Sequence, residues 1–343
     1  MKYNRCFAGL SRYLCVGLVL ISLSIHIVSA DTVRQQLISL HKGWNAVFLE
    51  VDPVSPKPSE CLQGTPITLV AAYIGNGSVV QYVQNPSTNN FSRKNGWVVW
   101  YAPDRPDAFL TQLFELRGNN PYLVYATNDF AWSVTGNAVL TSVTWKPNSF
   151  TLAGFGLDDV SPPTFDQFFD GSAAHHPYRI YRLVSDNWVL VDQAQSTQMR
   201  SGEAYWIFCR GGSDYQGPLT AKIQSGQTVS ISGLNPAGVS LANNSKNPLA
   251  VTVQNVSGYQ QLPLAFVLRA VTDTNVISAT FDLPDVYAMP SFDAGESRGF
   301  WLTVRTEKMT ADTQTGLLKV TTDLGTRCWL PVTASRSDLS SGN

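Results

Sequence analysis

Two adjacent histidines and a group of aspartates are the residues of this 343-residue sequence that most suggest a metal site. The histidines are His175 and His176, and the aspartates before them are Asp158, Asp159, Asp166 and Asp170. Adjacent side chains on a strand point to opposite faces, and no His-x-x-x-His spacing or Asp-x-Asp-x-Asp-Gly calcium loop accompanies them. We therefore expect no metal site, a solvated loop at the histidines and a turn at the aspartates.

Hydrolytic chemistry needs a nucleophile with a base, or two carboxylates at a fixed separation. The sequence has no Gly-x-Ser-x-Gly elbow, and no phosphate-binding Gly loop follows a strand. The best-placed glutamates, Glu50, Glu115 and Glu203, show no spacing that pairs them, and His41 reads as a surface residue at a strand end. These patterns predict a protein without catalytic residues or cofactors, and an enzyme of unknown class is the weakest alternative.

Aromatic side chains could bind a glycan, because sugar rings stack on exposed Trp and Tyr faces. The candidate stacking surface comprises Trp97, Trp100, Tyr101, Trp188 and Trp206. Small β modules also need large aromatic residues in their cores, and this role is the more frequent one for any single residue. Trp97 and Trp100 lie three apart on a strand and so face opposite sides. We expect at least one of them to be exposed, and Trp100-Tyr101 to mark the surface.

The first thirty residues have the pattern of a signal peptide. Lys2, Arg5 and Arg12 give a positive start without acidic residues, residues 13–28 are mostly apolar, and residues 28–30 are Val-Ser-Ala. An uncleaved anchor is the less favoured alternative, because the run is short for a bilayer of ~30 Å and contains His26. The sequence predicts cleavage after residue 30, no membrane span in the mature chain, and a secreted, periplasmic or cell-surface location.

The composition and the net charge limit the classes of molecule that the protein is expected to bind. Charged residues make up 14% of the chain, against about 25% in typical globular proteins. The net charge is −1, and loss of the three basic signal residues would take it to −4, which argues against nucleic-acid binding. Cys61, Cys209 and Cys328 would remain. This odd, widely spaced set is no disulfide framework, so we expect core burial and leave one bridge between two of them open.

Residues 42–53 open a β-rich unit, in which Gly43-Trp44-Asn45 leads into an apolar strand that ends at a proline. Further strands are predicted in 67–74, 79–83, 96–101, 122–125 and 130–136, with a turn at Asn76-Gly77 and a short helix in 108–116. The same order recurs from residue 149. Residues 150–155 match 44–49, residues 178–183 match 79–83, residues 187–191 match 96–100, and residues 200–208 overlay 117–125 without a gap. The sequence therefore predicts two module copies, at 31–140 and 146–222.

These motifs resemble the small Gly-Trp-Asn-type β modules of bacterial and archaeal secreted and surface proteins, which often sit beside Ig-like domains. The first copy matches at Gly43-Trp44-Asn45 and Trp97, and the second at Trp188, Gly202, Tyr205, Trp206 and Gly217. The match is partial, because Leu123 stands where the second copy has Trp206 and the second copy lacks Gly-Trp-Asn. The resemblance implies a structural motif and brings no catalytic residue.

From residue 225 to 335, eight short apolar runs separated by turn residues predict an Ig-like β-sandwich. Residues 293–304 and 313–321 resemble bacterial Ig-like modules, and residues 336–343 read as a loose tail. The whole is an all-β chain of two tandem related modules and a C-terminal Ig-like sandwich. It is expected to be an exported, non-catalytic structural or interaction protein of the bacterial cell surface or periplasm, with a protein or glycan partner at the envelope. A lectin-like carbohydrate-binding module is the alternative.

Overall fold

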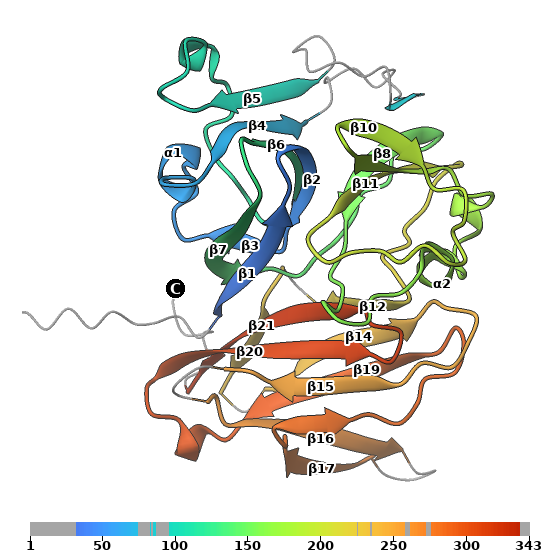
Figure 1. The fold of residues 1–343 in the computed structure, drawn as a ribbon. Coiled ribbons are helices and arrows are strands. Elements are labelled where there is room, and N and C mark those ends of the chain that lie inside the picture. Colours follow the sequence, from blue (N-terminus) through green and yellow to red (C-terminus); the bar gives the residue numbers. More distant parts are fainter. Residues whose placement is uncertain are drawn as a thin grey trace, which may run out of the picture.

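The protein is built almost entirely of β-strands. The computed structural model describes residues 32–74, 83, 85–86, 96–224, 226–233, 235–257, 261–271 and 276–336. Within these ranges the α-helices are α1 (Pro58–Cys61) and α2 (Phe165–Phe169), each little more than one turn. The predicted all-β fold is confirmed, with two related β modules followed by an Ig-like sandwich (Figure 1).

The first module contains two sheets, with strand orders β1-β7-β3 and β2-β6-β4-β5. Their strands are β1 (Val33–Leu40), β2 (Gly43–Leu49), β3 (Val51–Pro53), β4 (Ile67–Tyr73), β5 (Trp97–Tyr101), β6 (Asn120–Ala126) and β7 (Phe130–Ala138). The sequence of β1 alternates as expected for a strand with one face on a core. Gln36, Ile38 and Leu40 are buried, while the residues between them are exposed.

The second module repeats the larger sheet in the order β8-β11-β9-β10. Its strands are β8 (Ser149–Gly154), β9 (Ile180–Val184), β10 (Asn187–Leu190) and β11 (Ala204–Cys209). Trp206 pairs with Leu152 as Leu123 pairs with Ala46, so Trp206 occupies the place of Leu123. This register agrees with the ungapped overlay of 200–208 on 117–125.

A buried tyrosine fixes the same turn in both modules. The hydroxyl of Tyr122 accepts a hydrogen bond from the backbone N–H of Arg117 at 2.7 Å, and Tyr205 does the same for Arg200 at 2.7 Å. Burial raises the pKa of Tyr122 to about 12. The two phenol groups therefore act as neutral structural groups that close equivalent turns.

Two details of the predicted repeat are wrong. Ile180 pairs with Ile207 as Val70 pairs with Val124, so β9 corresponds to β4 and residues 178–183 do not match 79–83. The expected helix in 108–116 is a 3-10 turn, Ala108–Leu110, because the N–H groups of residues 112 and 113 donate to the carbonyl of Val99 on β5. The Asn76-Gly77 turn and residues 79–82 lie outside the described residues.

The C-terminal part is a sandwich of two five-stranded sheets, ordered β12-β14-β19-β16-β17 and β13-β21-β20-β15-β18. The first comprises β12 (Leu219–Ile223), β14 (Ala237–Asn243), β16 (Leu264–Val271), β17 (Val276–Asp282) and β19 (Ser297–Val304). The second comprises β13 (Val229–Ser232), β15 (Val251–Asn255), β18 (Val286–Ala288), β20 (Thr313–Thr322) and β21 (Arg327–Ser335). Since β12 pairs with β14, the sandwich begins at Leu219 and not at residue 225.

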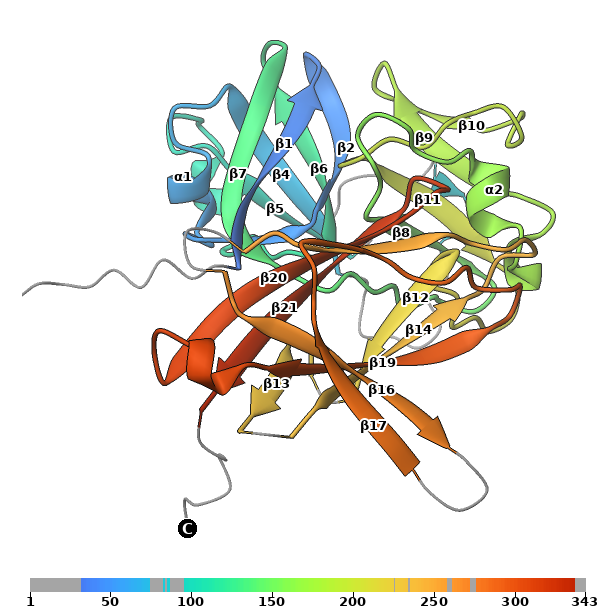
Figure 2. The same cartoon turned by 90° about the horizontal axis from the view of Figure 1, so that it is seen from below.

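The three parts form one body. The modules lie side by side above the sandwich, and β20 and β21 run beneath them (Figures 1 and 2). The four-stranded sheets of the two modules pack against each other, with β2 touching β8 and β11 while β8 touches β2 and β6. In the described part of the chain, no helix has the length and apolar character that a membrane crossing requires.

Candidate functional site

The predicted stacking surface is largely core. Trp97, Trp100 and Trp206 are only 2%, 6% and 0% exposed, so a glycan platform built on them is wrong. Trp97 and Trp100 do face opposite sides of their sheet, but both sides are covered. Trp100 packs into the core of the first module, whereas Trp97 packs against the second module. The sequence pattern did not reveal that a second module covers the outer face.

Trp206 is the centre of the contact between the modules. Its ring centroid lies 5.2 Å from that of Tyr73 and 6.4 Å from that of Trp97, both in the first module. On its own module, it lies 6.3 Å from Trp188. Trp188 and Tyr101 are the members of the predicted stacking set that remain partly exposed.

Phe48 and Gly154 meet at the middle of this interface. The strand register makes them equivalent positions of the two modules, because Phe48 pairs with Pro121 as Gly154 pairs with Ala204. A Cβ atom added to Gly154 would overlap the Cβ and Cγ atoms of Phe48. Glycine is thus required here by the close approach of the neighbouring module.

The histidine pair does not form a solvated loop, since His175 is 2% exposed. Its Nδ1 lies 2.6 Å from the hydroxyl of Ser172, and its ring centroid lies 4.3 Å from that of Trp145. Burial lowers the pKa of His175 to about 4, with a smaller contribution from His176, so the ring is neutral at pH 7. His175 therefore has a structural role. No cluster of metal-ligating side chains occurs among the described residues.

A buried ionic cluster joins all three parts of the protein at Glu50. This carboxylate has no exposed surface and accepts hydrogen bonds from Arg34 at 2.9 Å and from Arg327 Nη2 at 3.1 Å. Arg327, on β21 of the sandwich, also donates to Asp159 and Ser201 of the second module, each at 3.0 Å. Arg327 is thus the bridge from the sandwich to both modules.

The charged forms of Arg327 and Asp159 are stabilised within this cluster, whereas burial lowers the pKa of Arg34. Burial opposes the positive charge of Arg327, but the carboxylates of Glu50 and Asp159 together outweigh it and hold the pKa of the guanidinium above its usual value. For Asp159, burial is outweighed by hydrogen bonds from Ser201 and Arg327, which lower its pKa. The sequence carried one signal of the cluster, a lone glutamate between the apolar residues Leu49 and Val51.

Beside the cluster, a cleft of about 1010 Å³ opens between the two modules. One wall is residues 34–39 of β1, and the opposite wall is residues 182–186 together with the turn 200–203. Figure 2 shows β1 and β2 facing β9 and β10 across this space. The lining is mainly polar, and Arg327 lies at its base. The volume lies at the upper end of the range of ligand pockets.

The far end of the cleft is closed by the β9–β10 turn. Ser185 and Asp186 have φ angles of 46° and 65°, which places both in the left-handed region of a tight hairpin. Asp186 Oδ1 accepts a hydrogen bond of 2.6 Å from the backbone N–H of Trp44. The Gly-Trp-Asn motif therefore has a role that the sequence did not suggest, because it anchors the second module at this end. His41 is exposed there, as predicted.

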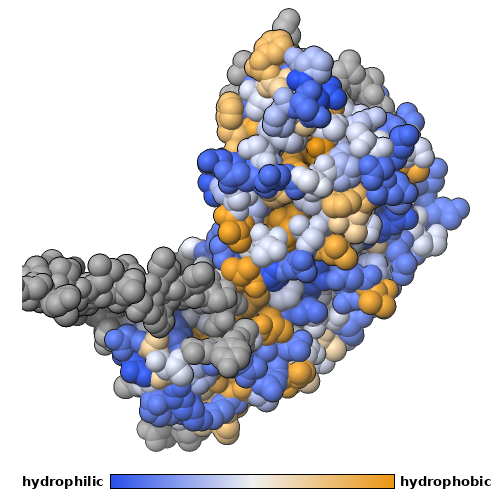
Figure 3. All heavy atoms as spheres, turned by 60° about the vertical axis from the view of Figure 1, so that its left-hand side comes forward, coloured by the Kyte–Doolittle hydropathy of each residue, from blue (hydrophilic) through white to orange (hydrophobic). Residues whose placement is uncertain are grey.

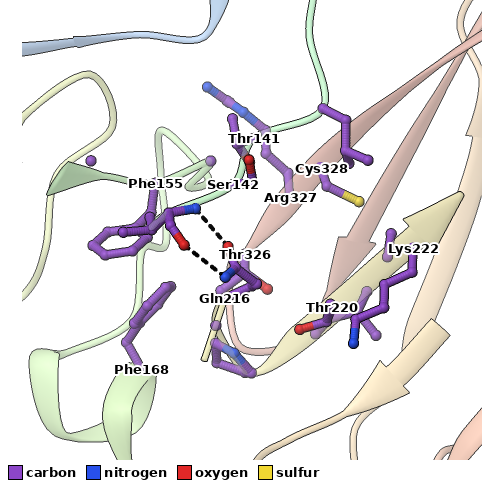
Figure 4. Close-up of a pocket in the computed structure, with 18 of the residues that line it drawn as sticks. Thr141, Ser142, Phe155, Phe168, Gln216, Thr220, Lys222, Thr326, Arg327 and Cys328 are labelled. Carbon is purple, nitrogen blue, oxygen red and sulfur yellow. Dashed lines mark hydrogen bonds between the residues drawn. The ribbon is translucent and has the colours of Figure 1, made fainter. Parts of the chain in front are cut away.

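A second pocket, of about 280 Å³, lies where the second module meets the sandwich (Figure 4). Phe155 and Phe168 lie on one side, and Lys222 and Cys328 lie on the other. The side-chain amide of Gln216 closes a paired contact with the backbone of residue 143, at 2.6 and 2.9 Å. This pocket is smaller than the cleft and belongs to the packing of the junction.

Cys61, Cys209 and Cys328 are free thiols, so no bridge joins any two of them. Cys209 is buried and the other two are half-buried. Burial raises the pKa of Cys61 to about 11 and that of Cys328 to about 12. Neither thiol has the lowered pKa of a reactive cysteine.

Exposed apolar side chains occur on the first module, and the larger ones are Leu37, Val54, Ile74, Phe109, Leu110 and Phe114. Figure 3 views the side of the molecule that lies at the left in Figure 1. The hydrophobic surface there forms patches broken by hydrophilic side chains. Within this view there is no single broad apolar face.

No family model matches the chain, and no curated protein matches it. Among solved structures, the YadV chaperone is 15% identical, with a TM-score of 0.24, over 37% of this chain and 55% of that one. The Salmonella enterica SafA pilin in complex with the SafB chaperone is 13% identical, with a TM-score of 0.25, over 36% of this chain and 57% of that one. The Enterococcus faecalis MSCRAMM ACE is 9% identical, with a TM-score of 0.20, over 90% of this chain and 91% of that one. This chain therefore spans about half the length of the chaperone chains, and scores at this level assign no function.

Proposed function

We propose that this chain is an exported, non-catalytic interaction protein of the bacterial cell surface or periplasm, and that it holds its partner in the cleft between the modules. The observation that carries the proposal is a cleft of about 1010 Å³ whose two walls belong to different modules. Binding sites are commonly found at such junctions.

The walls of the cleft are held in a fixed relation to each other, as a preformed binding site requires. Trp206 packs between the modules on one side, and the Glu50–Arg327 cluster ties them to the sandwich on the other. The hydrogen bond from Trp44 to Asp186 closes the end. A preformed cleft reduces the ordering cost of binding, which favours affinity without a large buried area.

The test uses the full chain, expressed with its own N-terminal segment and purified in the form that a bacterial host exports. N-terminal sequencing of this material checks cleavage near residue 30. The purified protein is incubated with insoluble polysaccharides, peptidoglycan and whole envelope preparations. We expect whole envelopes to retain the protein, because its partner in the envelope is expected to be a protein.

Ser39→Trp is the decisive variant, because Ser39 is exposed on β1 and lines the cleft. Thr135→Trp is its matched control, since Thr135 is exposed on the neighbouring strand β7 but does not line the cleft. Retention should fall about tenfold for the first variant and stay unchanged for the second. Equal retention of both would contradict the proposed site.

A glycan partner is the competing outcome of the same experiment. Trp188 and Tyr101 keep part of their surface exposed and could still stack on a sugar ring. Retention by one purified polysaccharide that is lost in Trp188→Ala, but kept in Ser39→Trp, would replace the cleft by a lectin-like surface.

A further inference from the structure

One wall of the cleft is a strand with an unpaired edge. β1 is the first strand of the sheet β1-β7-β3 and pairs with β7 on one side only. The N–H of Ala138 donates to the carbonyl of Thr32, so in the alternating antiparallel pattern residues 34, 36, 38 and 40 turn their backbone groups toward β7. The groups of residues 33, 35, 37 and 39 then point away from it.

These outward backbone groups face the cleft. Residues 34–39 line it, and within the described parts of the chain no backbone hydrogen bond joins the outward groups of Gln35, Leu37 or Ser39 to another strand. A strand of eight residues spans roughly 26 Å, at ~3.3 Å per residue. The cleft therefore offers an extended chain a regular row of donors and acceptors.

β1 has few of the features that usually block an open edge, and its single charged side chain, Arg34, is paired with the buried Glu50. Its sequence contains no proline or lysine, and its register with β7 is continuous from Val33 to Leu40 without a bulge. Leu37 is 65% exposed in the middle of the strand. Such an edge is suited to adding a strand from another chain.

The charge of the cleft selects among extended chains. Its three acidic side chains are engaged, Asp159 with Arg327, Glu203 with Arg182, and Asp186 with the N–H of Trp44. Two exposed cations, Lys42 and Arg200, also line the cleft. Within the described residues neither of them has an ion-pair partner. Asp186 bonds to a neutral N–H group and keeps its negative charge, so the unpaired charges that line the cleft are Lys42 and Arg200 against Asp186, a surplus of one positive charge.

We propose that the partner is an extended polypeptide segment with acidic side chains, which pairs with the free edge of β1 as an added strand and places carboxylates at Lys42 and Arg200. The inference rests on the proposed function of the cleft and names the class of partner. Backbone pairing supplies much of the affinity, and the two cations supply the preference for acidic sequences.

The experiment uses the full exported chain and three fluorescein-labelled nine-residue peptides that alternate Val with Glu, Lys or Ser. Binding is measured by fluorescence anisotropy at low and high salt. The Glu peptide should bind at least about tenfold more tightly than the Lys peptide, and the difference should shrink at high salt. Changing Lys42 and Arg200 together to Gln should remove the preference.

Leu37→Pro tests the edge itself, because it removes an N–H that points away from β7 and leaves the β1–β7 hydrogen bonds intact. Leu37→Ser is the matched control that keeps this N–H. The Pro variant should weaken binding of the Glu peptide at least about tenfold, and the Ser variant less than about twofold. Hydrogen exchange should show new protection at residues 35, 37 and 39 when the peptide is bound.

Equal binding by the two Leu37 variants, or no saturable binding to the wild type up to about 1 mM, would overturn the peptide proposal. If Ser39→Trp loses retention by envelopes and Leu37→Pro does not, the cleft is still the binding site, but the partner does not pair with the edge of β1. Unchanged retention in Ser39→Trp would remove the proposed function as well. A dimer of this chain formed through β1 would overturn the choice of partner.

Discussion

Replacing Glu50 by Gln should be among the most destabilising conservative changes in this protein. The carboxylate is fully buried and holds two guanidinium groups, those of Arg34 at 2.9 Å and of Arg327 at 3.1 Å. Glutamine keeps the size of the side chain but removes the negative charge, and its amide N–H₂ would face a cation. The change leaves two buried positive charges without their common partner.

The magnitude follows from what each arginine retains. Arg327 keeps Asp159 at 3.0 Å, whereas Arg34 has no other ion-pair partner in the described residues and keeps only its contact over the Trp329 ring at 4.3 Å. Removing one member of a buried ion pair costs about 3–5 kcal/mol. Because Arg327 remains partly compensated, we expect a loss near the lower end, about 3 kcal/mol in the free energy of unfolding.

Urea unfolding followed by tryptophan fluorescence measures this loss. Glu60→Gln is the control, because Glu60 pairs with Lys57 on the exposed surface, and the free energy of unfolding of this variant should stay close to that of the wild type. Adding Arg34→Met to Glu50→Gln removes one uncompensated charge and should recover at least about 1 kcal/mol. Equal effects of the Glu50 and Glu60 variants, or a double variant weaker than the single one, would refute the electrostatic reasoning.

Three further outcomes are expected. Trp206→Ala should cost about 3–5 kcal/mol in urea unfolding, because it empties the interface between the modules, and Trp188→Ala should cost less because this ring is only partly buried. Burial lowers the pKa of His175 to about 4, so the unfolded chain binds a proton at this residue at a higher pH than the native protein does. The free energy of unfolding should therefore fall by roughly 2–3 kcal/mol between pH 6.5 and 4.5. His175→Phe should lose this part of the pH dependence. Thiol labelling at pH 8 should be slow at Cys61 and Cys328 in the native protein, because burial raises their pKa to about 11 and 12, and fast in urea; fast native labelling would contradict their burial.

The repeat could be predicted from the sequence because equivalent strands and turns of the two modules carry similar residues at the same spacing. The overlay of 200–208 on 117–125 works because Tyr122 and Tyr205 make the same bonds to the same turn, and the match of Trp188 with Trp97 holds in the strand register. The match of 178–183 with 79–83 failed because short apolar strands resemble one another. Pairing partners, which no local pattern specifies, were needed to assign β9.

The candidate site was hidden from the sequence because it is made by packing between modules. Trp97 and Trp206 have the residue type of a stacking platform, and only the position of the neighbouring module shows that they are core. Glu50 and Arg327 are 277 positions apart, so no spacing could pair them. The open edge of β1 is likewise a property of the sheet order.

The contact between Phe48 and Gly154 has a consequence for assembly. Equivalent residues meet face to face at a twofold axis, so two identical first modules would bring Phe48 against a second Phe48 where one ring already fills the space. The large residue on one side and the missing side chain on the other make the pairing heterotypic. A first module from another molecule could therefore take the place of the second module only if one of the two Phe48 rings moved aside.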